Sequence, residues 1–270
     1  MEKTVLITGS TDGIGKLAAL QMAKQGHEVI LHGRNEEKLK ASLKEIKEQS
    51  SNEKIRAYLA DFSRLVEVKK MAVLIASKES KIDVLINNAG VFKSNNPRTE
   101  DGLDIRFAVN YFAPFILSQK LHDLLKASKS SRIINISSAA QSSVSLRALL
   151  GEEEISAQEA YAQSKLAIAM WSFHLASNGI SESVALNPGS LLNTKMVQEA
   201  YGQYWSSASK GAEIICDLAL TKKHYPMNCK YYDNDAGSFG PAHEDAYDEK
   251  RLNDLLESSF TYLKERSLLE

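Results

Sequence analysis

The sequence predicts an α/β fold with a doubly wound parallel sheet in a single domain. Short apolar runs alternate with longer amphipathic runs along the whole chain, which is the pattern of strands joined by covering helices. Several short runs are apolar throughout, as strands buried on both faces of a parallel sheet are. No repeat, low-complexity segment or Pro/Gly linker divides residues 1–270, so we expect one domain.

The elements follow in order from these two kinds of run. We expect strands at residues 4–8, 28–32, 54–59, 84–87, 132–137, 183–187 and 230–232. Amphipathic spacing predicts the helices between them, at residues 15–25, 36–48, 65–77, 102–127, 157–177 and 207–221, with a final helix at 245–265. The many charges of the second helix are typical of a solvated helix face.

Composition limits the partners and the compartment. The chain has 33 basic and 34 acidic residues and a net charge of −1, so nucleic acid and anionic membranes are not expected partners. Cys216 and Cys229 lack metal-ligand spacing, so we expect neither a metal site nor a disulfide framework. The N-terminus has no targeting pattern and no apolar run is long enough to span a bilayer. We therefore expect a cytoplasmic protein.

A glycine-rich turn joins the first strand to the first helix. Glycines allow a sharp turn and bring backbone N–H groups close to a pyrophosphate, which the positive end of the helix also attracts. The spacing is G-x-x-x-G-x-G, and the alternative is a tight connection without a ligand. Because the turn follows the first strand, we predict nucleotide binding by Gly9, Ser10, Thr11, Asp12, Gly13, Ile14 and Gly15.

Arg34 ends the second strand, where NAD-specific sites place an acidic residue that binds the ribose hydroxyl. A guanidinium there suits a 2′-phosphate, so we expect NADP(H) to be preferred, with NAD(H) still possible. Asp12 counts against a phosphate because it adds negative charge to the same loop. The alternative for Arg34 is a solvated side chain in a turn.

The ends of the third and fourth strands carry further candidates. Asp61, followed by Phe62, either caps the next helix or bonds an adenine amino group. The turn Asn88-Ala89-Gly90 is expected to make side-chain-to-backbone bonds and to allow close approach of a ribose.

Tyr161 and Lys165 are the most specific pair, since positions four apart share a helix face. An ammonium near a phenol favours the phenolate. A tyrosine titrates near pH 10, and lowering its pKa by about three units requires roughly 4 kcal/mol. Most Tyr-x-x-x-Lys pairs are only surface contacts, so the weight of this pair comes from its place after the fifth strand.

Three more sites complete the candidate set. Ser138 ends the fifth strand, where it either forms a turn or polarises a substrate carbonyl. Asn110 is a polar residue in an apolar helix and needs a water or backbone partner. After the sixth strand, a Pro-Gly turn crosses the expected cleft, and Thr194 begins another helical segment. The candidates in this loop are Pro188, Gly189, Leu191 and Thr194.

Taken together and in order, these motifs resemble the short-chain dehydrogenase/reductase family of the classical type, over nearly the whole chain. The long interval from Ser138 to Tyr161 and the strand at 230–232 are more similar to its retinol-dehydrogenase-like branch. The resemblance implies one Rossmann-type NAD(P)-binding catalytic domain over 1–270, with a substrate loop at about 189–210. Family members that prefer NADP often carry a basic residue where this chain has Asp12.

The resemblance also implies roles. Tyr161 is the general acid in reduction and the general base in oxidation, and Lys165 lowers its pKa and binds the nicotinamide ribose. Ser138 polarises the carbonyl, and Asn110 holds a water that extends a proton relay. The loop 188–194 holds the nicotinamide carboxamide. The expected function is NADP(H)-dependent hydride transfer to a carbonyl or from an alcohol.

Two other functions remain open at this stage. One is a redox sensor that binds NADP(H) without chemistry; the retained Tyr161 and Ser138 count against it. The other is a nucleotide-sugar epimerase or dehydratase, which needs a larger C-terminal domain. The sequence does not identify the substrate.

Two surface features give further expectations. Apolar positions in the helices at 102–127 and 157–177 exceed what one sheet face needs, so we expect a homodimer or homotetramer; the alternative is that they only cover the sheet. Val197, Tyr201, Tyr204 and Trp205 fall at helical spacing, which predicts one apolar lid face and an apolar substrate.

Overall fold

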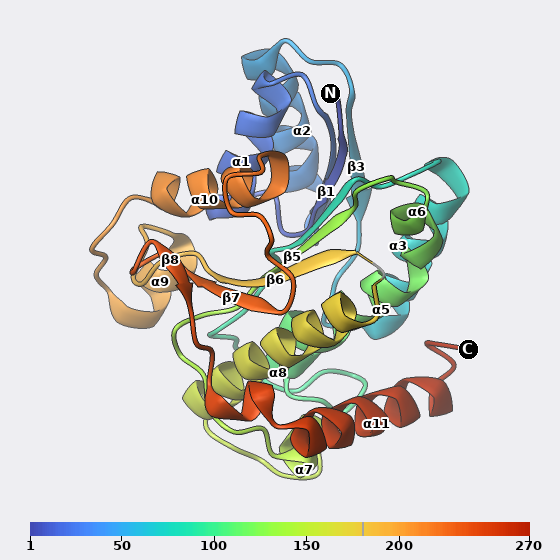
Figure 1. Ribbon diagram of the computed structural model, residues 1–270, viewed down its shortest axis with the longest axis vertical. Coiled ribbons are helices and arrows are strands. Elements are labelled where there is room, and N and C mark those ends of the chain that lie inside the picture. Colours follow the sequence, from blue (N-terminus) through green and yellow to red (C-terminus); the bar gives the residue numbers. More distant parts are fainter. Residues whose placement is uncertain (180) are drawn as a thin grey trace.

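A computed structural model describes residues 1–179 and 181–270 of the protein (Figure 1). The strands of the described residues form one sheet in the order β3-β2-β1-β4-β5-β6-β7-β8. The order reverses between β1 and β4, so the chain winds outward in both directions, and the predicted doubly wound fold is confirmed. The bounds are β1 Thr4–Ile7, β2 Glu28–Gly33, β3 Ile55–Leu59, β4 Val84–Asn87, β5 Arg132–Ile136, β6 Glu182–Asn187, β7 Lys230–Asp233 and β8 Ser238–Gly240.

The strands from β1 to β7 are parallel, as predicted, and the central ones are fully buried. The last strand, β8, was not predicted from the sequence. It pairs antiparallel to β7 and has three residues, too few to show an alternation of apolar and polar positions. Tyr232 and Phe239 pack edge to face across this pair.

Helices cover both faces of the sheet (Figure 1). One core lies between the sheet and the helices α1 (Gly13–Lys24), α2 (Glu36–Ser50) and α10 (Ala208–Leu220). The other lies under α3 (Leu65–Lys78), α5 (Ala113–Lys120) and α8 (Ala157–Ser177). A capping box formed by Ser156 and Glu159 fixes the start of α8, the helix that carries Tyr161.

The helix expected over 102–127 is broken. It consists of α4 (Ile105–Phe107), a π-helical turn η1 (Ala108–Phe112), α5 and α6 (His122–Lys126). Pro114 gives a physical reason for the π turn, because it has no N–H to donate to the carbonyl of Asn110 and its ring crowds that carbonyl. The distortion therefore falls at one of the candidate site residues.

The last helix, α11 (Glu249–Glu265), begins four residues later than predicted because Glu244–Tyr247 form a 3₁₀ turn, η2. It packs on the outer side of α5 and α8, where Phe260 meets Phe115 and Ser259 bonds Tyr111. The C-terminal helix thus covers Phe115 and Tyr111, while self-association stays a prediction from the sequence.

Two short helices complete the fold, α7 (Leu146–Leu149) and α9 (Lys195–Tyr201). Within the residues that the structure describes, none of the helices has the length and apolarity needed to cross a membrane.

Candidate active site

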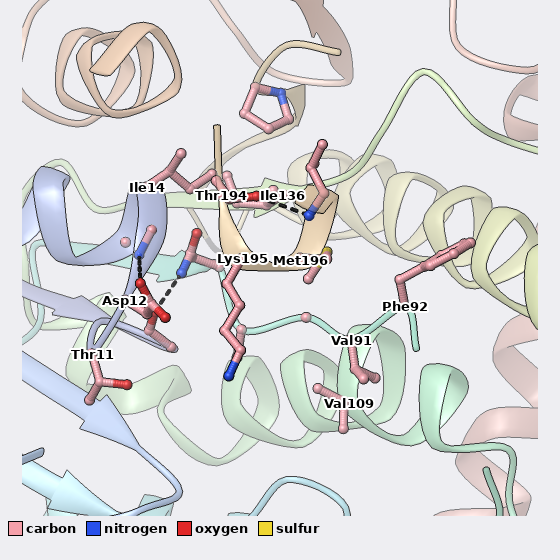
Figure 2. Close-up of a pocket in the computed structure, with 18 of the residues that line it drawn as sticks. Thr11, Asp12, Ile14, Val91, Phe92, Val109, Ile136, Thr194, Lys195 and Met196 are labelled. Atoms are coloured by element: carbon pink, nitrogen blue, oxygen red, sulfur yellow. Dashed lines mark hydrogen bonds between the residues drawn. The ribbon is translucent and has the colours of Figure 1, made fainter. Parts of the chain in front are cut away.

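A cavity of about 540 Å³ opens at the carboxyl ends of the parallel strands, where ligands bind in open α/β sheets. In Figure 2, Thr11 and Asp12 lie on one side and Val91, Phe92 and Val109 on the other. Most residues predicted from the sequence line this cavity: Gly9, Thr11, Asp12, Gly13, Ile14, Gly15, Arg34, Asp61, Phe62, Asn88, Ala89, Gly90, Ser138, Tyr161, Lys165, Pro188, Gly189 and Thr194.

Three predicted residues do not line the cavity. Ser10 is fully buried and its hydroxyl accepts a hydrogen bond from the His32 N–H. Leu191 lies in the loop with a φ of 45°, and its neighbour Leu192 faces the cavity instead. Asn110 lies behind the cavity wall, where its side chain bonds both backbone groups of Val91. Its amide therefore has the backbone partner that the sequence analysis offered as one alternative, and a second bond to the Ser164 hydroxyl; the water-holding role stays a prediction.

The glycine turn packs closely against the turn that follows β4. Gly9 has a φ of 63°, and a Cβ there would lie 2.8 Å from the Ala89 Cα. Asn88 holds the two loops together by donating to the carbonyls of Thr8 and Gly9, as the sequence predicted for this turn. Asp12 caps α1 by accepting from the Gly13 N–H, so its charge is partly taken up by the helix end. The cradle therefore fits a pyrophosphate.

The adenosine end of the cavity carries two cations. Arg34 and Lys38 both line it and both are exposed. Asn35 between them caps α2 by accepting from the Lys38 N–H, which holds the two side chains at the start of one helix. Lys38 is not among the residues predicted from the sequence, although its place four residues after Arg34 could have indicated it. The pair fits a 2′-phosphate.

The buried His32 side chain joins the glycine turn to the segment that follows β3. Its Nδ1 accepts from the Gly9 N–H at 3.0 Å, its Nε2 donates to the Ala60 carbonyl at 3.0 Å, and its ring stacks on Phe62. Burial lowers the pKa of His32 to about 4, so the ring is neutral at physiological pH.

This depressed pKa predicts acid sensitivity. The unfolded state binds the proton at a higher pH than the folded state, so stability falls as pH falls from about 6.5 to about 4. Between about pH 7 and pH 5, we expect His32 to account for a loss of about 2 kcal/mol in unfolding free energy. His32→Asn should remove that part of the slope in denaturant titrations, whereas His122→Gln should keep it. Equal slopes in wild type and His32→Asn would refute the assignment.

Tyr161, Lys165 and Ser138 meet at the other end of the cavity. The Lys165 ammonium is buried, donates to the Ile136 carbonyl at 2.8 Å and lies 5.5 Å from the centre of the Tyr161 ring. Burial raises the pKa of Tyr161 to about 12, against the lowering effect of a hydrogen bond with Ser138. Burial also lowers the pKa of Lys165 to about 8. The structure thus raises the tyrosine pKa where the sequence predicted a lowering, and burial is the largest cause of the rise.

Ser138 is held by residues that the sequence did not indicate. Its carbonyl accepts from the hydroxyl of Tyr231 at 3.0 Å and from the amide of Gln141 at 2.9 Å. Gln141 in turn accepts from the His243 N–H. The C-terminal quarter of the chain therefore fixes the strand end that carries Ser138.

The loop 188–194 is also anchored from the C-terminal part. The Asp235 carboxylate accepts from the N–H and the hydroxyl of Ser190 and from the Asn187 amide, and Asn234 donates to the Pro188 carbonyl. Burial raises the pKa of Asp235, but the bonds from Ser190 and Asn187 outweigh it and the net direction is downward. No sequence motif marks these two residues, because they follow β7 and lie far from the loop in sequence.

The apolar end of the cavity is walled by Val91, Phe92, Val109, Met196 and Val197. The predicted single lid face is wrong. Helix α9 ends at Tyr201 because Gly202 adopts a left-handed conformation with a φ of 70°. Tyr204 and Trp205 therefore lie beyond the helix, do not line the cavity and are 53% and 73% exposed. Thr194 caps α9 by accepting from the Val197 N–H, as its alternative role predicted.

Several curated proteins resemble this chain. Retinol dehydrogenase 13 from Mus musculus is 38% identical over 194 residues, which are 69% of this chain and 58% of that protein. The human retinol dehydrogenase 13 is 37% identical over 86% of this chain and 76% of its own length. Human polyprenol dehydrogenase is 34% identical over 64% of this chain and 54% of its length. The chain thus spans between about half and three quarters of these relatives.

Solved structures share the fold. A short-chain dehydrogenase from Escherichia coli CFT073, solved with NADPH, has a TM-score of 0.71 at 25% identity over 86% of this chain and 96% of that one. A protein from Mycobacterium Paratuberculosis has a TM-score of 0.77 at 24% identity, over 97% and 93% of the two chains.

The family model described as short chain dehydrogenase matches residues 3–205, a span that holds the glycine turn, Ser138, Tyr161 and Lys165. The chain belongs to the short-chain dehydrogenase family of NAD(P)-dependent oxidoreductases and, within it, to the retinol-dehydrogenase-like branch.

Proposed function

We propose that the protein is an NADP(H)-dependent oxidoreductase that transfers a hydride between the nicotinamide and a carbonyl or alcohol substrate. The observation that carries the proposal is one continuous cavity that joins the glycine cradle and the Arg34–Lys38 pair to Ser138, Tyr161 and Lys165. When bound, NADPH supplies the hydride. The protein positions the substrate and supplies the proton.

Tyr161 supplies the proton in the direction of reduction. Because burial keeps its pKa near 12, the phenol is protonated at neutral pH and can donate to the carbonyl oxygen as the hydride reaches the carbonyl carbon. Ser138 bonds the same oxygen as negative charge develops on it. Lys165, on the same face of α8, stabilises the phenolate that remains until solvent returns the proton.

Arg34 and Lys38 support a preference for NADP(H). Both line the adenosine end, and no acidic residue follows β2 until Glu36. The Escherichia coli relative was solved with NADPH, which agrees with this assignment. NAD(H) remains a possible second cofactor.

The substrate is proposed to be apolar near its carbonyl. The walls beside Tyr161 are aliphatic or aromatic, and two similar proteins are named for the long apolar alcohols retinol and polyprenol. The proposed substrate loop, about 189–210, contains α9, whose residue Met196 forms part of these apolar walls.

A cytoplasmic location and a homo-oligomer remain predictions from the sequence. Cys216 and Cys229 are free, which agrees with a reducing compartment. Because α11 covers α5 and α8, an oligomer would have to form through another surface.

A screen of NADPH oxidation over aldehydes, ketones, quinones and retinoids tests the proposed function. We expect turnover with apolar carbonyls, and NADPH binding should precede it. A redox sensor would bind NADPH without oxidising it in the presence of any of these compounds, and that outcome would overturn the proposal.

The anchored loop gives a prediction for cofactor binding. Asp235→Asn should raise the KM for NADPH by about tenfold, since a charged acceptor of the Ser190 N–H and hydroxyl is lost. Asp217→Asn is the matched control, because that carboxylate pairs with Lys223 on the surface. A lower melting temperature with unchanged KM in Asp235→Asn would show that Asp235 serves stability alone.

A further inference from the structure

The segment Val91–Phe92 leaves the fourth strand's turn and forms one wall of the cavity. Two side chains four residues apart hold it. Asn110 accepts from the Val91 N–H at 2.8 Å and donates to its carbonyl at 3.1 Å. Arg106 donates from Nε to the Phe92 carbonyl at 2.7 Å. The backbone of this wall is therefore fixed by side chains rather than by a sheet or helix.

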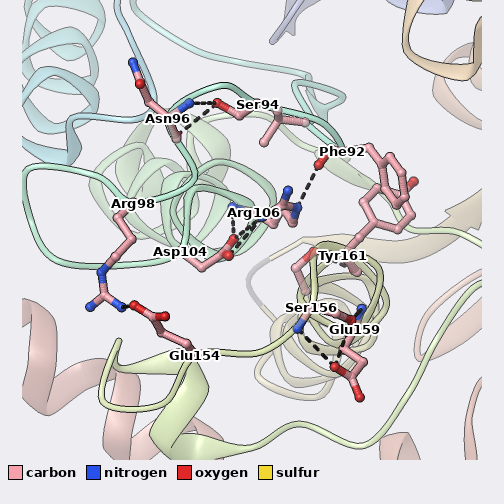
Figure 3. Close-up of polar contacts among 12 residues, drawn as sticks. Phe92, Ser94, Asn96, Arg98, Asp104, Arg106, Glu154, Ser156, Glu159 and Tyr161 are labelled. Atoms are coloured by element: carbon pink, nitrogen blue, oxygen red, sulfur yellow. Dashed lines mark hydrogen bonds and ion pairs between the residues drawn. The ribbon is translucent and has the colours of Figure 1, made fainter. Parts of the chain in front are cut away.

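Arg106 is a charged residue in an unusual place. It is only 3% exposed, and burial of a guanidinium is unfavourable unless it is paired and hydrogen-bonded. Asp104 provides the pair, with both carboxylate oxygens within 3.1 Å of Nη1. Figure 3 shows the guanidinium between Asp104 and the Phe92 carbonyl. The fixed ion pair leaves Nε aimed at that carbonyl, and no part of the proton transfer uses it.

The Phe92 ring contacts both Tyr161 and helix α9. It meets the Tyr161 ring edge to face, with 4.9 Å between centroids, and lies nearly parallel to Tyr201 of α9 at 5.8 Å. Helix α9 has no buried residue of its own. The stack on Phe92 joins the end of α9 to the opposite wall, and it lies beside Tyr161.

We propose that Phe92 determines which carbonyl substrates the site accepts, selecting those with a flat apolar group next to the carbonyl, and that Arg106 is its positioning residue. This inference rests on the proposed function and goes beyond it by naming the selecting side chain and the shape it selects. A planar group can enter between Phe92 and α9 and take over part of the ring stacking. A puckered aliphatic ring of the same size cannot stack in this way.

Benzaldehyde and cyclohexanecarbaldehyde are a matched pair for the test, because both carry a six-carbon ring and the rings differ in planarity. The conjugation of the benzaldehyde carbonyl is the same for every variant, so a change in the ratio between variants reports the ring contact. Wild type should prefer benzaldehyde in kcat/KM by about threefold to tenfold, the range of aromatic pair energies. Phe92→Leu should remove the preference by raising the KM for benzaldehyde, and Phe92→Tyr should keep the preference. Tyr225→Ala is the control, since Tyr225 is an exposed aromatic residue that does not line the cavity and lies outside the proposed substrate loop, and its ratio should equal that of wild type.

Arg106 is tested through the same ratio. Arg106→Lys keeps the charge near Asp104 but loses the planar fork that reaches the Phe92 carbonyl, so the benzaldehyde preference should fall. In the Phe92→Leu background, Arg106→Lys should cause no further change in the ratio of kcat/KM for benzaldehyde to that for cyclohexanecarbaldehyde. This non-additivity is what a double-mutant cycle shows when one residue acts through another. A lowered melting temperature with the wild-type ratio would mean that Arg106 is only structural, and would overturn its positioning role.

The two proposals fail in different ways. If wild type binds NADPH but reduces neither aldehyde, the proposed function fails. If it reduces both equally well, or if Phe92→Leu keeps the wild-type ratio, the function stands and the selecting role of Phe92 is overturned. Should Phe92→Leu fold poorly, Phe92→Met gives the same loss of planarity with a flexible side chain of similar volume.

Discussion

Tyr161→Phe is expected to lower kcat for carbonyl reduction by about 10²–10⁴-fold, the usual contribution of a positioned general acid. The affinity for NADPH should stay unchanged. The ring and its edge-to-face contact with Phe92 remain in the variant, and only the transferable proton is lost. The Ser138 hydroxyl bonds Tyr161, but a serine is a much weaker acid than a tyrosine.

The measurement compares steady-state kcat with NADPH fluorescence titration for wild type and variant. Tyr111→Phe is a matched control, because it removes a buried phenolic hydroxyl that bonds Ser259 and lies away from the cavity. Its kcat should match that of wild type. Substantial turnover in Tyr161→Phe would exclude Tyr161 as the acid.

The second large effect concerns the cofactor. Arg34→Asp combined with Lys38→Ala should lower kcat/KM with NADPH by at least about 100-fold, because two charged hydrogen bonds are lost at roughly 1.5–3 kcal/mol each and the aspartate repels the phosphate. Kinetics with NADH should fall little, or improve, since the introduced carboxylate can bind the ribose hydroxyls.

Lys40→Asp is the control for this pair. Lys40 lies on α2 as well, pairs with Glu36 on the surface and does not line the cavity. Kinetic constants for both cofactors should therefore stay at wild-type values. If the Arg34 and Lys38 changes leave the ratio of NADPH to NADH efficiency unaltered, these residues do not read the phosphate.

The sequence predicted those features that depend on neighbouring residues. Buried runs such as residues 4–7 and 132–136 indicated parallel strands, and the glycine turn indicated a nucleotide site, because periodicity and turn chemistry are local properties. The Tyr161–Lys165 pair was predictable for the same reason, since it depends only on helical spacing.

Features that depend on tertiary contacts could not be read in this way. The pKa of Tyr161 rises because the folded chain buries the phenol, and no pattern of spacing reports burial at one atom. Ser10 and Asn110 lie in motifs that match the family. In the structure, however, the Ser10 hydroxyl bonds the backbone of His32 and the Asn110 amide bonds the backbone of Val91. Asp235 reaches the cofactor loop only because β7 lies next to β6.

The helical lid was mispredicted through one residue. Helical spacing joined Tyr201 to Tyr204 and Trp205, but Gly202 lies between them and ends the helix in a left-handed conformation. A glycine at that position is a recognised stop signal, so the correct end of α9 was available in the sequence. The fixed position of the Val91–Phe92 wall could not be predicted from the sequence. It depends on the burial of Arg106, which is a property of the fold.

We propose that this cavity transfers a hydride from NADPH to a carbonyl carbon. The most direct test uses NADPH deuterated at the nicotinamide carbon that gives up the hydride, with benzaldehyde as substrate and mass spectrometry of the alcohol formed by the wild-type protein. The benzyl alcohol should carry one deuterium on its former carbonyl carbon, and none should be incorporated with the Tyr161→Phe variant over the same time. NADPH binding without deuterium in any alcohol product from the wild-type protein would contradict the proposal.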